Sequence, residues 1–197
     1  KKCVILAESA QGGIFSPVSR VTVSVASGSG MKDCLAAEGT AEDFRSIIED
    51  PDITKFGYDL KFQRNLLRHN GYRLEGKFMD IELMHYLVNP EKSHKIEILT
   101  RSYLNVNLED SMPEKEEDSL SLFDEVQEDK VSGNRYPEAA ATLLLGDAIE
   151  KELKEMELTD LYDSIEEPLV KVLSDMEMEG VKIDLIQLRR YAAGLST

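Results

Sequence analysis

The sequence has few of the residues that most metal and redox sites need. It contains only two cysteines among 197 residues, Cys3 and Cys34, and free thiols in a reducing cytosol are the simplest interpretation of so few. The three histidines, His69, His85 and His94, lack the spacing of a zinc site and are not paired with cysteine. We therefore interpret them as surface or packing residues.

Long apolar runs and nucleotide-binding motifs are also missing. No apolar stretch is long enough to span a membrane, and the N-terminus has no charged-then-apolar leader, so we expect a cytoplasmic monomer without a membrane partner. There is no P-loop, Rossmann glycine fingerprint or nucleophile elbow. Hydrophobic residues make up 42% of the chain, which is enough for one sizeable packed domain and an extension.

Basic residues are scarce, since 23 Lys and Arg stand against 38 Asp and Glu for a formal net charge of -15. Phosphates are bound by clustered Lys and Arg, so this charge argues against tight, sequence-independent nucleic-acid binding by this chain alone. The cations that are present concentrate in one region, where Lys61, Arg64 and Arg68 are candidates for a local nucleic-acid contact. An ordinary solvated helix face is the alternative.

Turn residues and alternating apolar residues predict a β-meander at the N-terminus. Its strands are expected at Cys3–Ala7, at Arg20–Ala26 and at Met31–Ala37. Thr40, with Asp43 three residues later, then predicts the N-cap of a helix.

The middle of the chain predicts a short strand that ends at Gly57 and two helices. The first helix covers about Leu60–His69, with Asp59 as its N-cap. Asp80 predicts the N-cap of the second, which stops at Asn89 because a proline follows.

These middle elements resemble the proofreading 3′–5′ exonuclease domain of the bacterial family A DNA polymerases, the DNA polymerase I family. The second motif of that family, roughly G-x-N-x-K-[YF]-D, reads GYDLKFQ over residues 57–63. The helix that opens F-D-T-x-L-x-x-Y-L-L-N in the family reads FMDIELMHYLVN over residues 78–89. The resemblance implies an α/β fold with a ribonuclease H-like (DnaQ-type exonuclease) core, a mixed sheet flanked by helices, and a C-terminal helical extension.

The family's first strand carries F-D-T-E, whose Asp and Glu bind two metal ions. Aligned by strand, these positions are Leu6 and Glu8, so the Glu is kept and the Asp is lost. A slip by one residue would place Ala7 at the Asp position instead, and neither alignment restores a second carboxylate there.

The later motifs lose their acidic residues too. The final Asp of the second motif is Gln63. The third motif, Y-x-x-x-D, keeps Tyr136 but has Ala140 in place of Asp. Asp147 is no easy substitute, because it lies two helical turns farther on, roughly 10 Å along the axis.

Two-metal phosphodiester hydrolysis needs carboxylates that hold both cations about 4 Å apart. Leu6, Glu8, Gln63 and Ala140 supply a single carboxylate between them. We therefore predict no catalytic residue, no metal and no cofactor in this chain, and expect Mg²⁺ only for the polymerase domain of a full protein.

Residues 166–184 resemble the E-x-P-L-x-x-V-L-x-x-M-E-x-x-G-V-x-I-D signature that joins exonuclease to polymerase in this family. They predict an amphipathic helix that ends at Gly180. The implied organisation is a degenerate exonuclease-like domain at 1–158, with an acidic flexible loop at about 109–133, and the start of the polymerase domain, its thumb-side helices, at 159–197. We expect the chain to be part of a longer polymerase.

The predicted function is a vestigial 3′–5′ exonuclease domain, without proofreading, that is a structural platform for DNA-templated DNA synthesis. Its partner would be DNA, bound through the full-length enzyme. One alternative is a weakly active metal-dependent exonuclease in which Glu8, Asp59 and Asp80 improvise a metal site. The other is a module whose acidic loop, Glu109 to Lys130, docks a replication partner.

Overall fold

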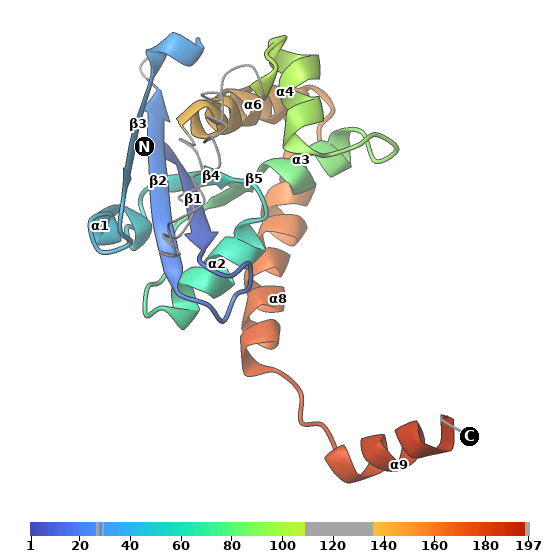
Figure 1. Cartoon of the computed structure of the whole chain (residues 1–197). Helices are drawn as coiled ribbons and strands as arrows, with labels where there is room; N and C mark the ends of the chain where they lie inside the picture. The colour runs from blue at the N-terminus through green and yellow to red at the C-terminus, as the bar shows by residue number, and fades with distance from the viewer. Residues whose placement is uncertain (27, 29, 109–135, 196–197) are drawn as a thin grey trace, which may run out of the picture.

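Strand β1 (Lys2–Ser9) lies at the centre of a five-stranded sheet with the order β3-β2-β1-β4-β5 in a computed structural model, which describes residues 1–26, 28, 30–108 and 136–195 (Figure 1). β2 (Val18–Ala26) and β3 (Cys34–Gly39) continue from β1 in antiparallel pairs, which confirms the predicted meander. β4 (Thr54–Gly57) and β5 (Phe78–Asp80) are parallel to β1, so the sheet is mixed. The third strand begins later than predicted, because residues 31–33 form a 3-10 turn.

Helices cover both faces of this sheet (Figure 1). Since successive side chains of a strand point to opposite faces, β1 contributes to two hydrophobic clusters. Val4 and Leu6 pack in the first cluster, and Ile5 and Ala7 in the second. The helices on the Leu6 face are α3 (Ile81–Val88), α4 (Ile96–Leu104) and α6 (Tyr136–Glu155). Those on the Ala7 face include α1 (Arg45–Ile48) and α2 (Leu60–His69).

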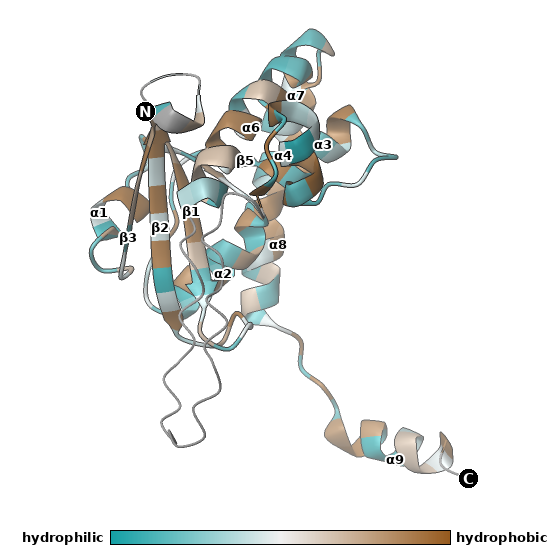
Figure 2. Ribbon diagram, turned by 45° about the horizontal axis from the view of Figure 1, so that its top comes forward, coloured by the Kyte–Doolittle hydropathy of each residue, from teal (hydrophilic) through white to brown (hydrophobic). Residues whose placement is uncertain are grey.

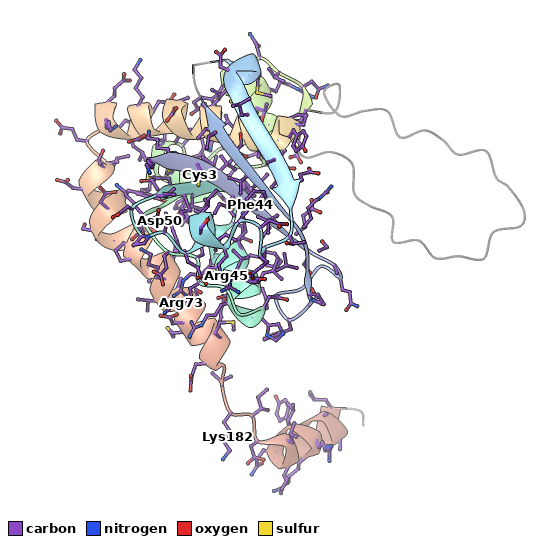
Figure 3. The ribbon with its side chains drawn as sticks, turned by 90° about the vertical axis from the view of Figure 1, so that its left-hand side faces the viewer. Cys3, Phe44, Arg45, Asp50, Arg73 and Lys182 are labelled. Atoms are coloured by element: carbon purple, nitrogen blue, oxygen red, sulfur yellow. The ribbon has the colours of Figure 1, made fainter. Side chains whose placement is uncertain are left out.

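The helix predicted after Thr40 is shorter than expected. Thr40 and Asp43 do exchange main-chain to side-chain hydrogen bonds, at 2.8 and 3.3 Å, but α1 is a single turn that starts at Arg45. Ile48 is its only buried residue, and a longer helix would gain little from packing. Arg45, labelled in Figure 3, is the first residue of α1, and its guanidinium lies 4.4 Å from the ring centroid of Tyr72.

Both predicted aspartate caps in the middle of the chain are confirmed. Asp59 adopts a left-handed conformation and its side chain accepts a hydrogen bond from the N–H of Phe62 at 3.1 Å. The carboxylate of Asp80 accepts from the N–H groups of Glu82 and Leu83 at 3.0 and 3.4 Å. These caps fix where α2 and α3 begin.

The C-terminal part of the chain runs as a helical column beside α2 and then leaves the body of the protein (Figure 1). The column comprises α7 (Thr159–Leu161), a π-helical turn η2 (Tyr162–Glu166) and α8 (Glu167–Glu179). Gly180, at φ +72°, ends α8 as predicted. α9 (Leu185–Leu195) then stands apart from the sheet and its helices (Figure 2).

The predicted acidic loop, including Glu109 to Lys130, lies outside the described residues. Within the described part of the chain, no helix is both long and apolar enough to cross a membrane. Cys3 and Cys34 are free thiols, as the sequence predicted, and burial raises the pKa of Cys3 to about 11.

Candidate functional site

The candidate exonuclease positions gather around the end of β1, between α6 on one face of the sheet and α2 on the other. Leu6 and Glu8 belong to β1 itself, Gln63 lies on α2, and Ala140 lies on α6. Tyr136, the remaining candidate, is the first residue of α6 and is 39% exposed. The strand therefore carries the site, and two helices from distant parts of the chain enclose it.

Leu6 is an ordinary core residue. Its side chain is buried in the cluster that includes Ala139, Ala141 and Leu143 of α6. Residues two apart on a strand share a face, so Leu6 and Glu8 point toward α6, whereas Ala7 packs in the cluster on the other face. The Asp and Glu of F-D-T-E are two residues apart and must share one face to bind the same metal ions. Leu6 shares a face with Glu8 and Ala7 does not, which favours the alignment that puts Leu6 at the lost Asp position.

Gln63 is buried and both ends of its amide are hydrogen-bonded within the protein. Oε1 accepts a hydrogen bond from the N–H of Ala7 at 3.0 Å, and Nε2 donates to the carbonyl oxygen of Tyr58 at 2.8 Å. The side chain thus connects α2 to β1 and to the turn before α2. A carboxylate could not form the second bond, because it has no donor when ionised.

Ala140 allows α6 to lie close to the sheet. It is buried, and its carbonyl oxygen is 4.0 Å from Sγ of Cys34 at the start of β3. Asp147 does not replace the missing carboxylate here, as expected, since it forms an ion pair with Lys2 at 2.9 Å. The third-motif position is therefore occupied by a methyl group in close packing.

Glu8 is the one acidic position that the chain keeps, and its carboxylate is paired with Arg20. One guanidinium nitrogen of Arg20 donates to both carboxylate oxygens of Glu8 at 3.0 Å, and the other donates to Glu38 at 3.3 Å. Sequence reasoning missed Arg20, because it resembles no family motif. The strand register, which places Arg20 opposite Glu8, is the signal that reveals it.

Asp59 and Asp80, the other carboxylates of the weak-nuclease alternative, already serve as helix caps. Asp80 is almost fully buried, and its second oxygen accepts from the N–H of Leu60 at 2.6 Å. Burial raises the pKa of Asp80 to about 6, although the main-chain N–H donors oppose this shift. Among the described residues, no group of three or more His, Cys, Asp and Glu could hold a metal ion. The residues present do not fit the two metal ions that the family's site implies.

The three cations predicted to contact nucleic acid all face α8. Lys61 forms an ion pair with Glu177 at 2.7 Å, and Arg64 and Arg68 both pair with Asp175, at 2.8 and 2.5 Å. Arg64 also donates to the hydroxyl of Ser174. These contacts hold α2 against α8, and a role of the same cations in binding DNA remains a prediction.

The histidines are surface and packing residues, as predicted. His85 is buried, and its Nδ1 lies 2.7 Å from Nδ1 of His94. Burial lowers the pKa of His85. The ring of His69 packs edge-on against Phe15 with a centroid distance of 5.3 Å.

Comparison with known proteins finds relatives in the family that the sequence resembles. Residues 26–111 match the family model described as DNA polymerase I, ribonuclease H-like domain. The chain is 31% identical over 141 residues to DNA polymerase I of Synechocystis sp., an alignment that covers 69% of this chain and 14% of that protein. It matches DNA polymerase I of Bacillus subtilis at 27% identity over 157 residues, covering 79% of this chain and 18% of that protein. The chain thus spans well under a quarter of these relatives' lengths.

Solved structures agree on the fold. The POL domain of Pol1 from M. smegmatis, in complex with DNA primer-template and dNTP, superposes with a TM-score of 0.71 at 22% identity, over 98% of this chain and 31% of that one. Brucella melitensis NrnC superposes with a TM-score of 0.65 at 16% identity, over 91% and 85%. At these identities the two structures show that the fold is shared, and the predicted ribonuclease H-like class is confirmed.

Proposed function

Because this chain carries a ribonuclease H-like, 3′–5′ exonuclease-like domain of the bacterial DNA polymerase I type, we propose that the domain is catalytically silent. It performs no proofreading and is a structural platform for DNA-templated DNA synthesis by a longer polymerase. DNA primer-template is bound in the M. smegmatis structure, and we propose DNA as the partner of the full-length protein here. Residues 1–158 form the platform and 159–197 begin the polymerase domain, whose synthesis would use Mg²⁺.

Gln63 is the observation that carries this proposal. The attacking water of a two-metal hydrolase is ionised by a cation that carboxylates hold in place. At the second-motif position, the side chain of Gln63 instead accepts a hydrogen bond from the main chain of Ala7 and donates one to the main chain of Tyr58. Leu6 and Ala140 are buried in packing. No second carboxylate stands beside Glu8 at the family's positions to share a metal.

The surface of the C-terminal helices supports the platform role. α8 buries Val170 against the sheet but leaves other apolar residues of the C-terminal helices exposed. Those residues are Ile165 in η2 and Leu169, Val172, Leu173 and Met176 in α8. Their spacing places them along one face of a helix, and an exposed apolar face is typical of a region that another part of a protein covers.

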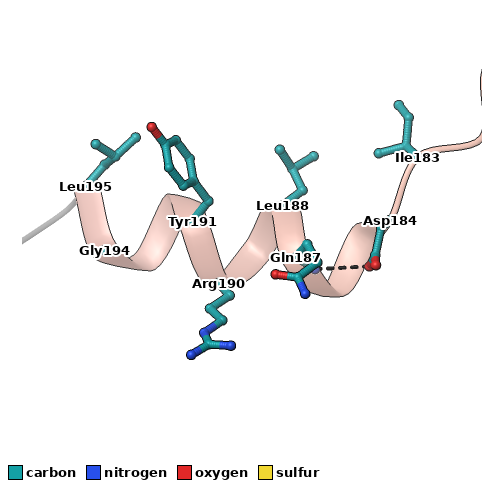
Figure 4. Close-up of a pocket in the computed structure, with 8 residues that line it drawn as sticks. All are labelled: Ile183, Asp184, Gln187, Leu188, Arg190, Tyr191, Gly194 and Leu195. Atoms are coloured by element: carbon teal, nitrogen blue, oxygen red, sulfur yellow. Dashed lines mark hydrogen bonds between the residues drawn. The ribbon is translucent and has the colours of Figure 1, made fainter.

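α9 repeats this arrangement. Figure 4 shows Leu188, Tyr191 and Leu195 on one side of the helix and Arg190 on the other. The helix is capped by Asp184, whose carboxylate accepts from the N–H of Gln187 at 3.0 Å. A helix with such a stripe that stands apart from the described sheet and its helices (Figure 2) fits a segment that docks on a further domain.

Degradation of 5′-labelled single-stranded DNA with Mg²⁺ and with Mn²⁺ tests the catalytic part of the proposal. We expect no cleavage by the parent chain. A variant with Leu6→Asp, Gln63→Asp and Ala140→Asp is the comparison, since cleavage by it alone would show that the frame of the site is intact. Metal-dependent shortening from the 3′ end by the parent would contradict the proposal.

The weak-exonuclease alternative makes a different prediction for the same assay. Parent activity would then depend on Glu8, and Glu8→Gln would abolish it while the protein stays folded. The pairing of Glu8 with Arg20, and the capping roles of Asp59 and Asp80, favour the silent domain.

A further inference from the structure

Arg20 bridges two carboxylates at the site, as a divalent cation would. Its guanidinium donates to Glu8 through one nitrogen and to Glu38 through the other. The three side chains are only 14% to 19% exposed, so solvent screens their charges weakly. The Arg20 guanidinium therefore lies between two partly buried anions.

The strand register explains why these side chains meet. In the β1–β2 pair, Glu8 lies opposite Arg20 and Leu6 opposite Thr22, and in the β2–β3 pair Thr22 lies opposite Glu38. Because alternate residues share a face, all of them point to the α6 face with Leu6, where the family's ligands would lie. The ion pair is thus built into the sheet.

We propose that Arg20 is the internal counter-ion that excludes divalent cations from this site. This inference rests on the proposed function and goes beyond it: the site has lost ligands, and it has also filled the cation position with a residue of its own. The cation position is thus occupied by a side chain of the protein itself.

The exclusion follows from geometry and charge. A bound divalent ion needs carboxylate oxygens at about 2.0–2.6 Å, and both oxygens of Glu8 already accept hydrogen bonds from Arg20. An ion that displaced these bonds would lie within a few ångströms of a fixed positive charge, where like charges repel strongly. With Arg20 removed, Glu8 and Glu38 would instead repel each other and gain from a shared cation.

Substitution of Arg20 in the otherwise unchanged chain tests the proposal, with Mn²⁺ as the probe. Arg20→Met keeps a similar volume and removes the charge and every donor. We expect Mn²⁺ to raise its Tm in a dose-dependent way, and calorimetry to show binding at least about tenfold tighter than in the parent, which is a difference of about 1.4 kcal/mol. If the variant is unfolded in metal-free buffer, Mn²⁺ is expected to restore its circular dichroism.

Matched variants identify the source of the effect. Arg45→Met is the control, because Arg45 also bridges two glutamates, Glu42 and Glu49, but its side chain is more exposed, at 42%. Arg20→Lys keeps the charge and should still exclude Mn²⁺. Adding Glu8→Gln to Arg20→Met should abolish the gained binding.

A response of Arg20→Met to Mn²⁺ no greater than that of Arg45→Met, whether the protein is folded or unfolded, would overturn the inference. So would Mn²⁺ binding by the parent with the same affinity as by Arg20→Met. The measurement uses no DNA, so it is separate from the nuclease assay. A parent that cuts DNA refutes the silent-domain proposal, and an inert parent with an unresponsive Arg20→Met refutes only the role of Arg20.

Discussion

The side-chain oxygen of Gln63 accepts a hydrogen bond from the main-chain N–H of Ala7 at 3.0 Å, and this bond joins α2 to the central strand. The same amide donates to the carbonyl of Tyr58 at 2.8 Å. Gln63, which we propose to occupy the position of a metal ligand, is thus a structural cross-link in this protein. Its loss should be measured first as a loss of stability.

Gln63→Asp should lower the free energy of unfolding by about 2–4 kcal/mol, because the shorter side chain loses both bonds and leaves buried polar groups unpaired. Gln63→Glu keeps the length and the bond from Ala7, but it places a second oxygen against the carbonyl of Tyr58. This variant should be less stable at pH 8 than at pH 5, because burial beside the carbonyl of Tyr58 disfavours the ionised carboxylate. Urea unfolding at both pH values measures this, with Gln187→Glu on exposed α9 as the control. Equal losses from Gln187→Glu would refute the cross-link.

The buried carboxyl group of Asp80 should stabilise the protein more in mild acid than at neutral pH. Its pKa is about 6 in the folded state against an ordinary value of 3.8. Because the folded pKa is raised, its contribution is fully present below pH 3.8 and is lost as pH rises through about 6. The parent should gain up to about 3 kcal/mol relative to Asp80→Asn between pH 7 and pH 4. Urea titrations of both proteins across this range measure the difference, and parallel pH profiles would contradict the assignment.

The helices of the middle region were predictable because local chemistry fixes them. The two aspartate caps, Asp59 and Asp80, and the apolar spacing that follows each of them leave little choice of boundary. The resemblance to a family with known motifs then predicted the mixed sheet. The residues that form each cap and helix lie within about ten positions of one another in the sequence. The residues of a family motif follow one another along one strand.

The Arg20 ion pair and the orientation of α8 were not predictable in the same way. Which residue faces Glu8 depends on the register between β1 and β2, and a slip of one residue would move Arg20 to the other face. The apolar stripe of residues 165–176 was visible in the sequence, but α8 turns this stripe outward and buries Val170 and Ser174 instead. A polar seam with Asn65, which accepts from the hydroxyl of Ser174, decides that orientation.

Gly146 should be irreplaceable in α6, because a methyl group there would lie 2.1 Å from the nearest ring carbon of Phe56. Phe56 is fully buried in β4 and cannot move aside, so Gly146→Ala should cost about 1–3 kcal/mol through overpacking. Gly194→Ala in α9 is the matched control. A methyl group there meets nothing within 4 Å, and the change should be neutral or stabilise the helix by about 0.5–1 kcal/mol. Thermal unfolding of both variants measures this difference. Equal changes in Tm for the two variants would contradict the prediction.

Substitutions of Arg64 and Lys61 distinguish a structural role of the basic residues of α2 from a role in DNA binding. Arg64 is 18% exposed and donates to Asp175 and Ser174, so Arg64→Met should cost about 1–3 kcal/mol of stability. The pair between Lys61 and Glu177 is more exposed, at 37% and 44%, and Lys61→Met should cost less than about 1 kcal/mol.

Urea unfolding and the affinity for single-stranded DNA, measured on the same two proteins, distinguish the roles. Since Asp175 and Glu177 already neutralise these cations, we expect each substitution to change DNA affinity less than about twofold, whereas loss of one phosphate contact would weaken binding at low salt and reduce the salt dependence by about one unit. An Arg64→Met protein that unfolds at the parent's urea midpoint but binds DNA several-fold more weakly would reverse this assignment. Arg64 would then contact the nucleic acid, and the seam between α2 and α8 would have to open for it to do so.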